Sequence, residues 1–321
     1  YIMQILREAG LPDGVISMLP GDGKVIGAPA LDHPGLMGVH FTGSTNVFKH
    51  IWKTVGTNID KYYGYPRVVG ETGGKDYVVA HSSADPQALA VGLARGAFEY
   101  QGQKCSAASR AYIPVSLWPR VREETYGMLD TMKMGDVRDF SNFINAVIDA
   151  RAYTKISGYV EQAKADADVS VEYGGEHEDK DGYFIRPTVI VTRDPKYRTM
   201  QEEIFGPVLS VYVYPDNEWE QTLKLAAHTS PYGLTGAVFA NERSALVEAD
   251  KALAHSVGNF YVNDKPTGAV VGQQPFGGGR ASGTNDKAGS YLNLLRWVSP
   301  RTVKENFNPP RDYKYPFLAA E

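Results

Sequence analysis

The sequence predicts an α/β protein in which strands and helices alternate in layers. Short apolar runs typical of strands are followed by glycine-containing turns and then by segments whose apolar residues recur at helical spacing. Of the 321 residues, 43% are hydrophobic and 22% are charged, which is typical of a globular protein and excludes disordered and coiled-coil chains. At about 150 residues per domain, this length favours two domains.

The N-terminal segment is predicted to be a helix that ends at Gly10 and Pro12, because its apolar residues Ile2, Ile5, Leu6 and Ala9 recur at helical spacing. This helix has no start signal and the chain does not begin with Met, so we expect a piece of a longer protein. Residues 14–19 form an apolar run that predicts a short strand, closed by the turn at 20–23.

Residues 39–41 predict a second strand, which leads through 42–45 into a helix with Val47, Phe48, Ile51 and Trp52 on one face. Further strands are predicted at 76–80, 112–115, 169–173, 188–191, 208–213, 235–239 and 258–262. Helices are predicted at 86–98, 119–132, 150–167, 218–228 and 242–254. The glycine-rich stretch 267–289 fits neither period, which is typical of a functional loop, and the proline-containing tail from Arg301 is predicted to run extended.

Charge and composition exclude several classes of function. There are 33 Lys and Arg against 37 Asp and Glu, a net charge of −4, and nucleic-acid binding requires a basic surface instead. No run of 18 apolar residues predicts a membrane span. The single Cys excludes an internal disulfide and favours a reducing compartment. The seven His residues do not have the spacing of metal ligands, so no metal site is predicted. Neither Ser44 nor Ser106 lies in the nucleophile elbow of a serine hydrolase.

Cys105 is a candidate nucleophile. The adjacent Lys104 would favour the thiolate electrostatically, and small neighbours leave the sulfur accessible. On local sequence alone, a lone Cys is more often a small buried hydrophobic residue.

Glu71 is a candidate general base. It follows an apolar strand, whose burial would raise the carboxyl pKa, and two glycines after it permit close backbone approach. The local alternative is a solvated loop carboxylate.

Two further segments are candidates for binding. Gly43 and Ser44 lie between a strand and a helix, where backbone N–H groups bind phosphate, although a simple helix cap fits equally well. Glu203 could accept hydrogen bonds from ribose hydroxyls, and Phe205 offers an aromatic wall; an ordinary acidic turn is the alternative.

Six motifs together resemble the aldehyde dehydrogenase superfamily. They are Pro-Gly-Asp-Gly at 20–23, Phe-Thr-Gly-Ser-Thr at 41–45, Glu-Thr-Gly-Gly-Lys at 71–75, Gly-Gln-Lys-Cys at 102–105, Glu-Glu-Ile-Phe-Gly-Pro at 202–207 and Pro-Phe-Gly-Gly at 275–278. They occur in the family's order, with base and nucleophile 105 − 71 = 34 residues apart. Flanking residues at 104–106, 264–269, 271–276 and 280–287 resemble the 1-pyrroline-5-carboxylate dehydrogenases, which oxidise L-glutamate γ-semialdehyde.

This resemblance implies roles for individual residues. Cys105 would form a thioester with the substrate, and Glu71 would activate the water that hydrolyses it. NAD would be the cofactor, contacted by Gly23, Gly43, Ser44, Glu203 and Phe205. Lys104, Ser106, Gly268, Ala269 and Phe276 would bind the semialdehyde, and no metal is expected.

The resemblance also implies the organisation of the chain. Residues 1–70 would be the end of a Rossmann-type NAD-binding domain, 71–266 an α/β catalytic domain, and 267–321 a substrate loop followed by an oligomerisation tail. We expect a homo-oligomeric enzyme that acts in proline catabolism, in a bacterial cytoplasm or a mitochondrial matrix. Without the missing N-terminal part, this chain should be weakly active or inactive. Another semialdehyde or aliphatic aldehyde dehydrogenase and a non-catalytic assembly fragment remain as alternatives.

Overall fold

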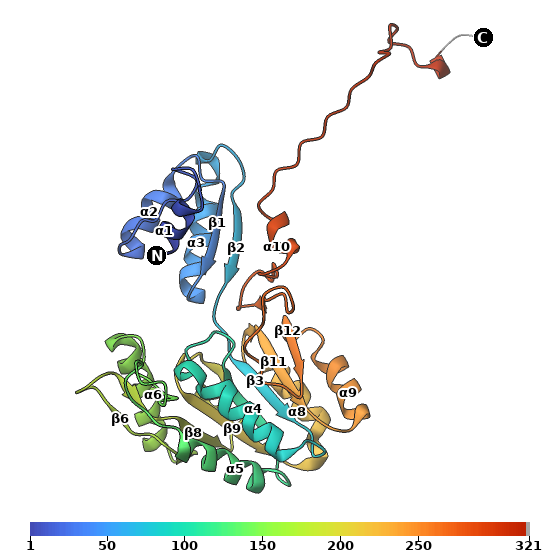
Figure 1. The fold of residues 1–321 in the computed structure, drawn as a ribbon. Coiled ribbons are helices and arrows are strands. Elements are labelled where there is room, and N and C mark those ends of the chain that lie inside the picture. Colours follow the sequence, from blue (N-terminus) through green and yellow to red (C-terminus); the bar gives the residue numbers. More distant parts are fainter. Residues whose placement is uncertain (319–321) are drawn as a thin grey trace.

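The computed structural model describes residues 1–318 and divides them between a small and a large α/β unit (Figure 1). The small unit contains a two-stranded parallel sheet of β1 (Gly38–Thr42) and β2 (Arg67–Glu71), with Thr42 opposite Glu71. Its helices are α1 (Ile2–Glu8), α2 (Gly23–Asp32) and α3 (Thr45–Thr57). The core is formed by Leu31, Phe48, Ile51, Val55, Tyr62 and Val68.

The large unit is built on a seven-stranded sheet in the order β12-β11-β3-β4-β9-β8-β5. All neighbouring strands are parallel except β5 and β8, which are antiparallel. The strands are β3 (Asp76–Ala80), β4 (Ala108–Pro114), β5 (Val169–Tyr173), β8 (Thr188–Thr192), β9 (Val208–Tyr214), β11 (Thr235–Phe239) and β12 (Asn259–Val262). Their nearly continuous apolar sequences fit a parallel sheet covered on both faces.

Helices cover both faces of this sheet, and alternate residues of β3 show how. Val78 packs in one core with α4 (Pro86–Phe98) and α5 (Trp118–Thr131). Val79 packs on the opposite face with α8 (Trp219–His228) and α9 (Arg243–Leu253). Because successive side chains of a strand point to opposite faces, the two cores lie on either side of the sheet. A third core joins α6 (Ala150–Ala165) to β8 and β9.

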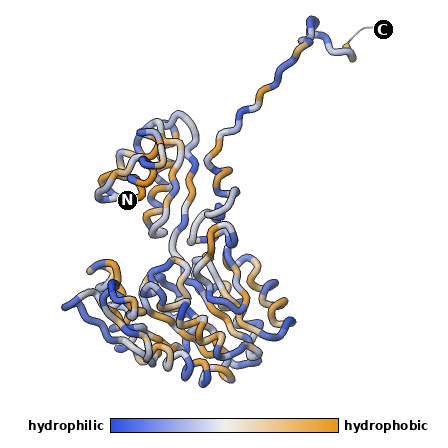
Figure 2. Tube along the Cα trace, viewed as in Figure 1, coloured by the Kyte–Doolittle hydropathy of each residue, from blue (hydrophilic) through white to orange (hydrophobic). Residues whose placement is uncertain are grey.

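Short elements complete the structure. They are α7 (Arg198–Gln201), α10 (Tyr291–Leu295), and the pairs β6 (His177–Glu178) with β7 (Phe184–Ile185) and β10 (Tyr232–Gly233) with β13 (Gly279–Arg280). Residues 299–318 extend away from the body, with hydrophobic and hydrophilic residues mixed along them (Figures 1 and 2). The last three residues of the predicted oligomerisation tail, 319–321, lie outside the described residues.

The predicted strand at residues 14–19 is wrong. The segment forms turns and coil, all six residues are exposed, and none pairs with a strand within the described chain. An apolar run becomes a strand only where a neighbouring strand accepts its hydrogen bonds, and the one partner of β1 here is β2. The expected inward face of α3 is also partly wrong, since Trp52 and Val47 are about half exposed while Val55 is buried.

Candidate active site

One cavity of about 860 Å³ contains the predicted nucleophile and the predicted base. It lies between the carboxyl ends of β1 and β2 and the amino ends of β3, β4 and β9, and the loop before α10 closes it. Its lining comprises residues 42–44, 71–73, 103–106, Lys155, Glu203, Phe205, 267–269, Val271, Gln274, Phe276 and 288–289. Segments far apart in the sequence therefore converge on a single site.

Cys105 is partly exposed and its position is fixed by a strained backbone. Just before it, the non-glycine residues Tyr100 and Gln101 adopt positive φ angles of 55° and 56°. Gly102 packs so tightly that an added Cβ would lie 2.3 Å from the carbonyl oxygen of Gly206. Such backbone conformations cost free energy and are concentrated at functional sites. The sulfur is thus held at the cavity and is not sealed in the core.

The charges around Cys105 differ from the sequence expectation. Burial, followed by the carboxylates of Asp76, Glu203 and Glu71, raises the pKa of Cys105 to about 12. Lys104 does line the cavity, but its ammonium is paired with Glu99 at 2.8 Å. The expected thiolate stabilisation by Lys104 is therefore wrong, because a paired lysine cannot offset the surrounding carboxylates.

Glu71, the last residue of β2, is a buried carboxyl group. Only 7% of its surface is exposed, and neither carboxyl oxygen has a hydrogen-bond partner within residues 1–318. Burial raises its pKa to about 7, while Lys287 acts to lower the pKa and Asp286 to raise it. A carboxyl group with this proton affinity can take up and release a proton near neutral pH, as general-base catalysis requires.

The loop that carries Glu203 and Phe205 is fastened from two sides. Glu203 Oε1 accepts a hydrogen bond of 2.9 Å from Gly74 N–H, and Lys155 Nζ donates to the Glu203 carbonyl oxygen at 2.8 Å. Burial raises the pKa of Glu203. Phe205 has a positive φ of 62° and is 42% exposed. Sequence reasoning missed Lys155, which lies in a helix with no motif around it.

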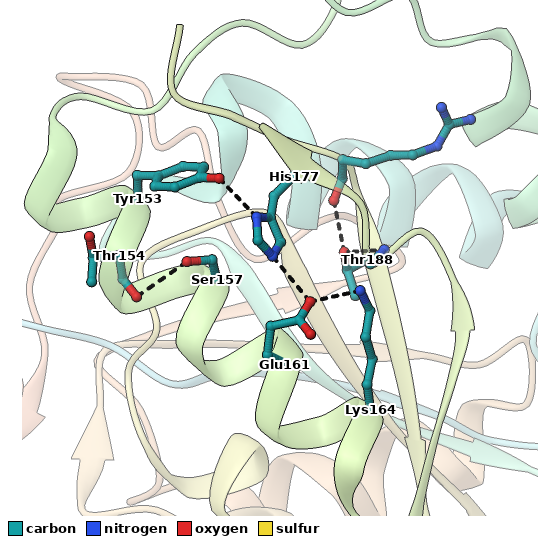
Figure 3. A network of polar contacts seen from close by, with 9 residues as sticks. Tyr153, Thr154, Ser157, Glu161, Lys164, His177 and Thr188 are labelled. Carbon is teal, nitrogen blue, oxygen red and sulfur yellow. Dashed lines mark hydrogen bonds and ion pairs between the residues drawn. The ribbon is translucent and has the colours of Figure 1, made fainter. Parts of the chain in front are cut away.

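The helix α6 that carries Lys155 is itself braced by a polar network at the β6–β7 hairpin (Figure 3). Tyr153 Oη lies 2.8 Å from His177 Nδ1, and His177 Nε2 lies 3.1 Å from Glu161 Oε1. Lys164 Nζ donates to the same Glu161 oxygen at 2.8 Å. The hairpin therefore braces helix α6, and Lys155 on that helix holds the Glu203 loop.

The predicted cofactor residues are only partly brought together. An added Cβ at Gly43 would lie 2.5 Å from the ring of Phe41, so only glycine fits there. Ser44 caps α3 by accepting a 3.4 Å hydrogen bond from Val47 N–H, as the simple-cap interpretation required. Gly23 is the exposed first residue of α2, and it is not among the described residues that line the cavity.

The predicted substrate residues all line the same cavity. Ser106 Oγ lies 2.7 Å from Thr267 Oγ1, and both residues are buried. Gly268 has a φ of +86°, a conformation that favours glycine, and Ala269 follows it. Phe276 is held by reciprocal backbone hydrogen bonds of 2.9 and 2.7 Å with Ala288. Thr267 was missed because nothing in the local sequence marks a hydroxyl partner 161 residues away.

Residues 1–318 contain neither a metal-binding cluster nor a membrane-spanning helix. No group of three or more His, Cys, Asp or Glu side chains there could hold a metal ion. In the same residues, none of the helices combines the length and the apolar character that a membrane span needs.

Known proteins resemble the chain over nearly its whole length. A mitochondrial delta-1-pyrroline-5-carboxylate dehydrogenase of Dictyostelium discoideum is 53% identical over 319 residues, which are 99% of this chain and 57% of that protein. Its human namesake is 47% identical over 318 residues, 99% of this chain and 56% of that protein. A crystal structure of the Mycobacterium tuberculosis delta-pyrroline-5-carboxylate dehydrogenase bound with NAD matches with a TM-score of 0.93 and 54% identity, covering 99% of this chain and 58% of that one.

The chain thus spans less than two thirds of the length of these relatives. The model of the aldehyde dehydrogenase family matches residues 1–303. The sequence and the fold both match this family, and the cavity contains the cysteine and the glutamate of its motifs; the chain belongs to the aldehyde dehydrogenase family.

Proposed function

We propose that this chain is part of an NAD-dependent dehydrogenase that oxidises L-glutamate γ-semialdehyde, formed from 1-pyrroline-5-carboxylate, to L-glutamate in proline catabolism. The observation that carries the proposal is the shared cavity, which Cys105 and Glu71 line together with the predicted substrate residues and all predicted cofactor residues except Gly23. The names of the relatives support the choice of substrate.

The residues on the α3 side of the cavity fit a dinucleotide. The N-terminus of α3 reaches the cavity at Gly43 and Ser44, where backbone N–H groups and the helix dipole favour phosphate. One carboxyl oxygen of Glu203 accepts a hydrogen bond from Gly74 N–H, and the carboxyl group would also accept hydrogen bonds from the ribose hydroxyls. Phe205 would lie against the nicotinamide. When bound, NAD supplies a hydride acceptor beside Cys105.

The chain's own residues would divide the remaining chemistry. The Cys105 thiol adds to the aldehyde carbon while its proton passes to the aldehyde oxygen, which forms a thiohemiacetal; loss of a hydride from the carbon and of the hydroxyl proton would then give the thioester. Glu71 then takes a proton from the water that attacks the thioester carbon, and the Cys105 sulfur leaves as the carboxylic acid product forms. The pKa of about 7 suits Glu71 to this step.

The substrate would be held by its amino-acid head. The backbone at Gly268 and Ala269 offers polar groups to the charged α-amino acid, and Ser106 and Lys104 lie in the same cavity. Phe276 would pack against the aliphatic part of the substrate. Holding one end of a short molecule places its other end at the nucleophile.

We further infer three segments, 1–70 for cofactor binding, 71–266 for catalysis and 267–321 for the substrate loop and assembly. The exposed aromatic side chains Phe307, Tyr313 and Tyr315 in the tail support a role in homo-oligomer contacts. Deleting residues 301–321 should lower the mass measured by light scattering to that of a smaller assembly, and an unchanged mass would contradict this role. A bacterial cytoplasm or a mitochondrial matrix fits this function.

The function can be tested by following NADH formation with this chain and L-glutamate γ-semialdehyde. We expect slow turnover, because the relatives contain further sequence, and no NADH with Cys105→Ser. Succinate semialdehyde should react more slowly, because it lacks the α-amino group. Glu71→Gln should give a burst of about one equivalent of NADH and then stall. Equal rates for the two aldehydes would contradict the substrate, and activity in Cys105→Ser would contradict the mechanism.

A further inference from the structure

We propose that Lys287 is a positioning residue for Glu71, holding a fixed positive charge that stabilises the carboxylate form of the base. Lys287 belongs to the loop that follows β13, and the sequence analysis assigned it no role of its own. The inference rests on the proposed role of Glu71 and extends it.

Hydrogen bonds place this loop directly beside Glu71. Thr72 N–H donates to the carbonyl of Ser282 at 2.9 Å, and Thr284 N–H donates to the carbonyl of Gly70 at 3.0 Å. Glu71 itself forms an antiparallel bridge with Gly283. The loop therefore runs alongside the end of β2 as an added strand and brings its next residues to the carboxyl group.

The Glu71 carboxyl group and the Lys287 side chain both lie next to Gly277. An added Cβ at Gly277 would lie 3.0 Å from Glu71 Oε1 and 3.2 Å from the Lys287 backbone nitrogen. The Lys287 ammonium is tied down, since it donates to the carbonyls of Gly258 at 2.6 Å and Gly277 at 3.3 Å. Asn285 and Lys287 both have a φ of +55°, a conformation that costs non-glycine residues free energy. The fold thus maintains a strained loop that anchors the Lys287 ammonium to two backbone carbonyls, one of which belongs to the glycine next to the Glu71 carboxyl group.

The charges that face Glu71 act in opposite directions. Lys287 lowers its pKa and Asp286 raises it, while burial is the largest effect. Asp286 is partly neutralised by Arg296, whose Nε lies 3.0 Å from Asp286 Oδ1. Cys105, on the facing loop, stays a neutral thiol because its pKa is about 12. With Asp286 paired to Arg296, the Lys287 ammonium is the charge that favours an ionised Glu71; burial lowers the pKa of Lys287 itself, and Glu71 acts to raise it.

This arrangement can be tested on the deacylation step alone. The 321-residue chain is treated with p-nitrophenyl acetate, so that the Cys105 sulfur attacks the ester carbon, p-nitrophenolate leaves and an acetyl thioester forms. Excess reagent is removed, and hydrolysis of the adduct to acetate is followed by intact mass spectrometry from about pH 5 to about pH 9. Because this step needs neither NAD nor aldehyde, it reports on Glu71 directly.

Two adjacent substitutions should move the pH midpoint of deacylation in opposite directions. Lys287→Gln keeps a donor for the carbonyls but removes the charge, and should raise the midpoint by about one pH unit or more. Asp286→Asn should lower it. Lys287→Arg should stay near wild type, as should Lys224→Gln, which removes an exposed lysine paired with Glu220 on α8.

The outcomes separate the inference from the function on which it rests. Wild-type deacylation in Glu71→Gln would overturn the role of Glu71 itself. If Glu71→Gln stalls but Lys287→Gln and Asp286→Asn only change the rate, with the midpoint of wild type, then Lys287 has a purely structural role and the inference is refuted.

Discussion

Replacing Glu71 with Gln should stabilise the protein at alkaline pH, because the folded protein buries an ionised carboxylate without a hydrogen-bond partner in the described residues. The pKa of Glu71 rises from 4.5 to about 7, a difference of about 2.5. At about 1.4 kcal/mol per pKa unit, the carboxylate form costs about 3–4 kcal/mol of folding free energy. The side chain is 7% exposed, so solvent screens this cost little.

The sign of the pH dependence follows from linkage. Because the folded state holds the proton more tightly than the unfolded state, Glu71 destabilises the protein increasingly as pH rises from 4.5 to about 7, and the cost is constant above that value. Gln is neutral throughout. The other buried titratable groups are common to both proteins and cancel in the difference.

Urea unfolding followed by tryptophan fluorescence measures this difference. The free energy of unfolding of Glu71→Gln should exceed that of wild type by about 3–4 kcal/mol at a pH near 8.5, and most of this difference should vanish near pH 4.5. Because packing changes in the variant do not depend on pH, only the change in the difference is diagnostic. A stability difference that is the same at both pH values would refute the assignment of a raised pKa to Glu71.

Three further substitutions test residues that line the cavity or hold the loops around it. Gly74→Ala would place a Cβ 2.0 Å from the carbonyl oxygen of Cys105, so acetylation of Cys105 by p-nitrophenyl acetate should fall at least about tenfold; an unchanged rate would show that the nucleophile loop is not held there. Ser106→Ala leaves the buried Thr267 hydroxyl without its 2.7 Å partner and should lower the unfolding free energy by about 1–2 kcal/mol, whereas stability equal to wild type in urea titration would count against this hydrogen bond. Phe276→Ala should raise KM for the semialdehyde more than KM for NAD in steady-state assays, and equal increases would remove Phe276 from the substrate site.

Elements whose periodicity reflects packing within this chain could be predicted well. The strands at 76–80, 169–173 and 235–239 were predicted with the bounds that the structure has. The apolar run at 14–19 has the composition of a strand, but sheet formation depends on a partner that local sequence does not specify. Helix α2 was missed because Gly23, Gly27 and Pro29 obscure its helical pattern.

Site residues that lie in a recognisable motif could be predicted from the sequence. Site residues that reach the cavity only because distant segments fold together could not. Cys105 and Glu71 stand in recognisable segments, and the structure places both at one cavity. Nothing in the sequence around Lys155 or Lys287 marks a role for either lysine, and only the folded chain shows that Lys155 bonds the Glu203 carbonyl and that Lys287 lies near Glu71. The effect of Lys104 was misjudged because its partner Glu99 follows from a local turn and not from a motif.

The high proton affinity of the Cys105 sulfur has a consequence for the survival of the protein in an aerobic cell. Peroxides and electrophilic metabolites attack thiolates far faster than thiols, and at neutral pH almost none of this sulfur is in the anionic form. Burial, followed by the neighbouring carboxyl groups, therefore keeps the sulfur in the form that reacts slowly with oxidants. The only cysteine in the chain can therefore remain a protonated thiol when no substrate is bound.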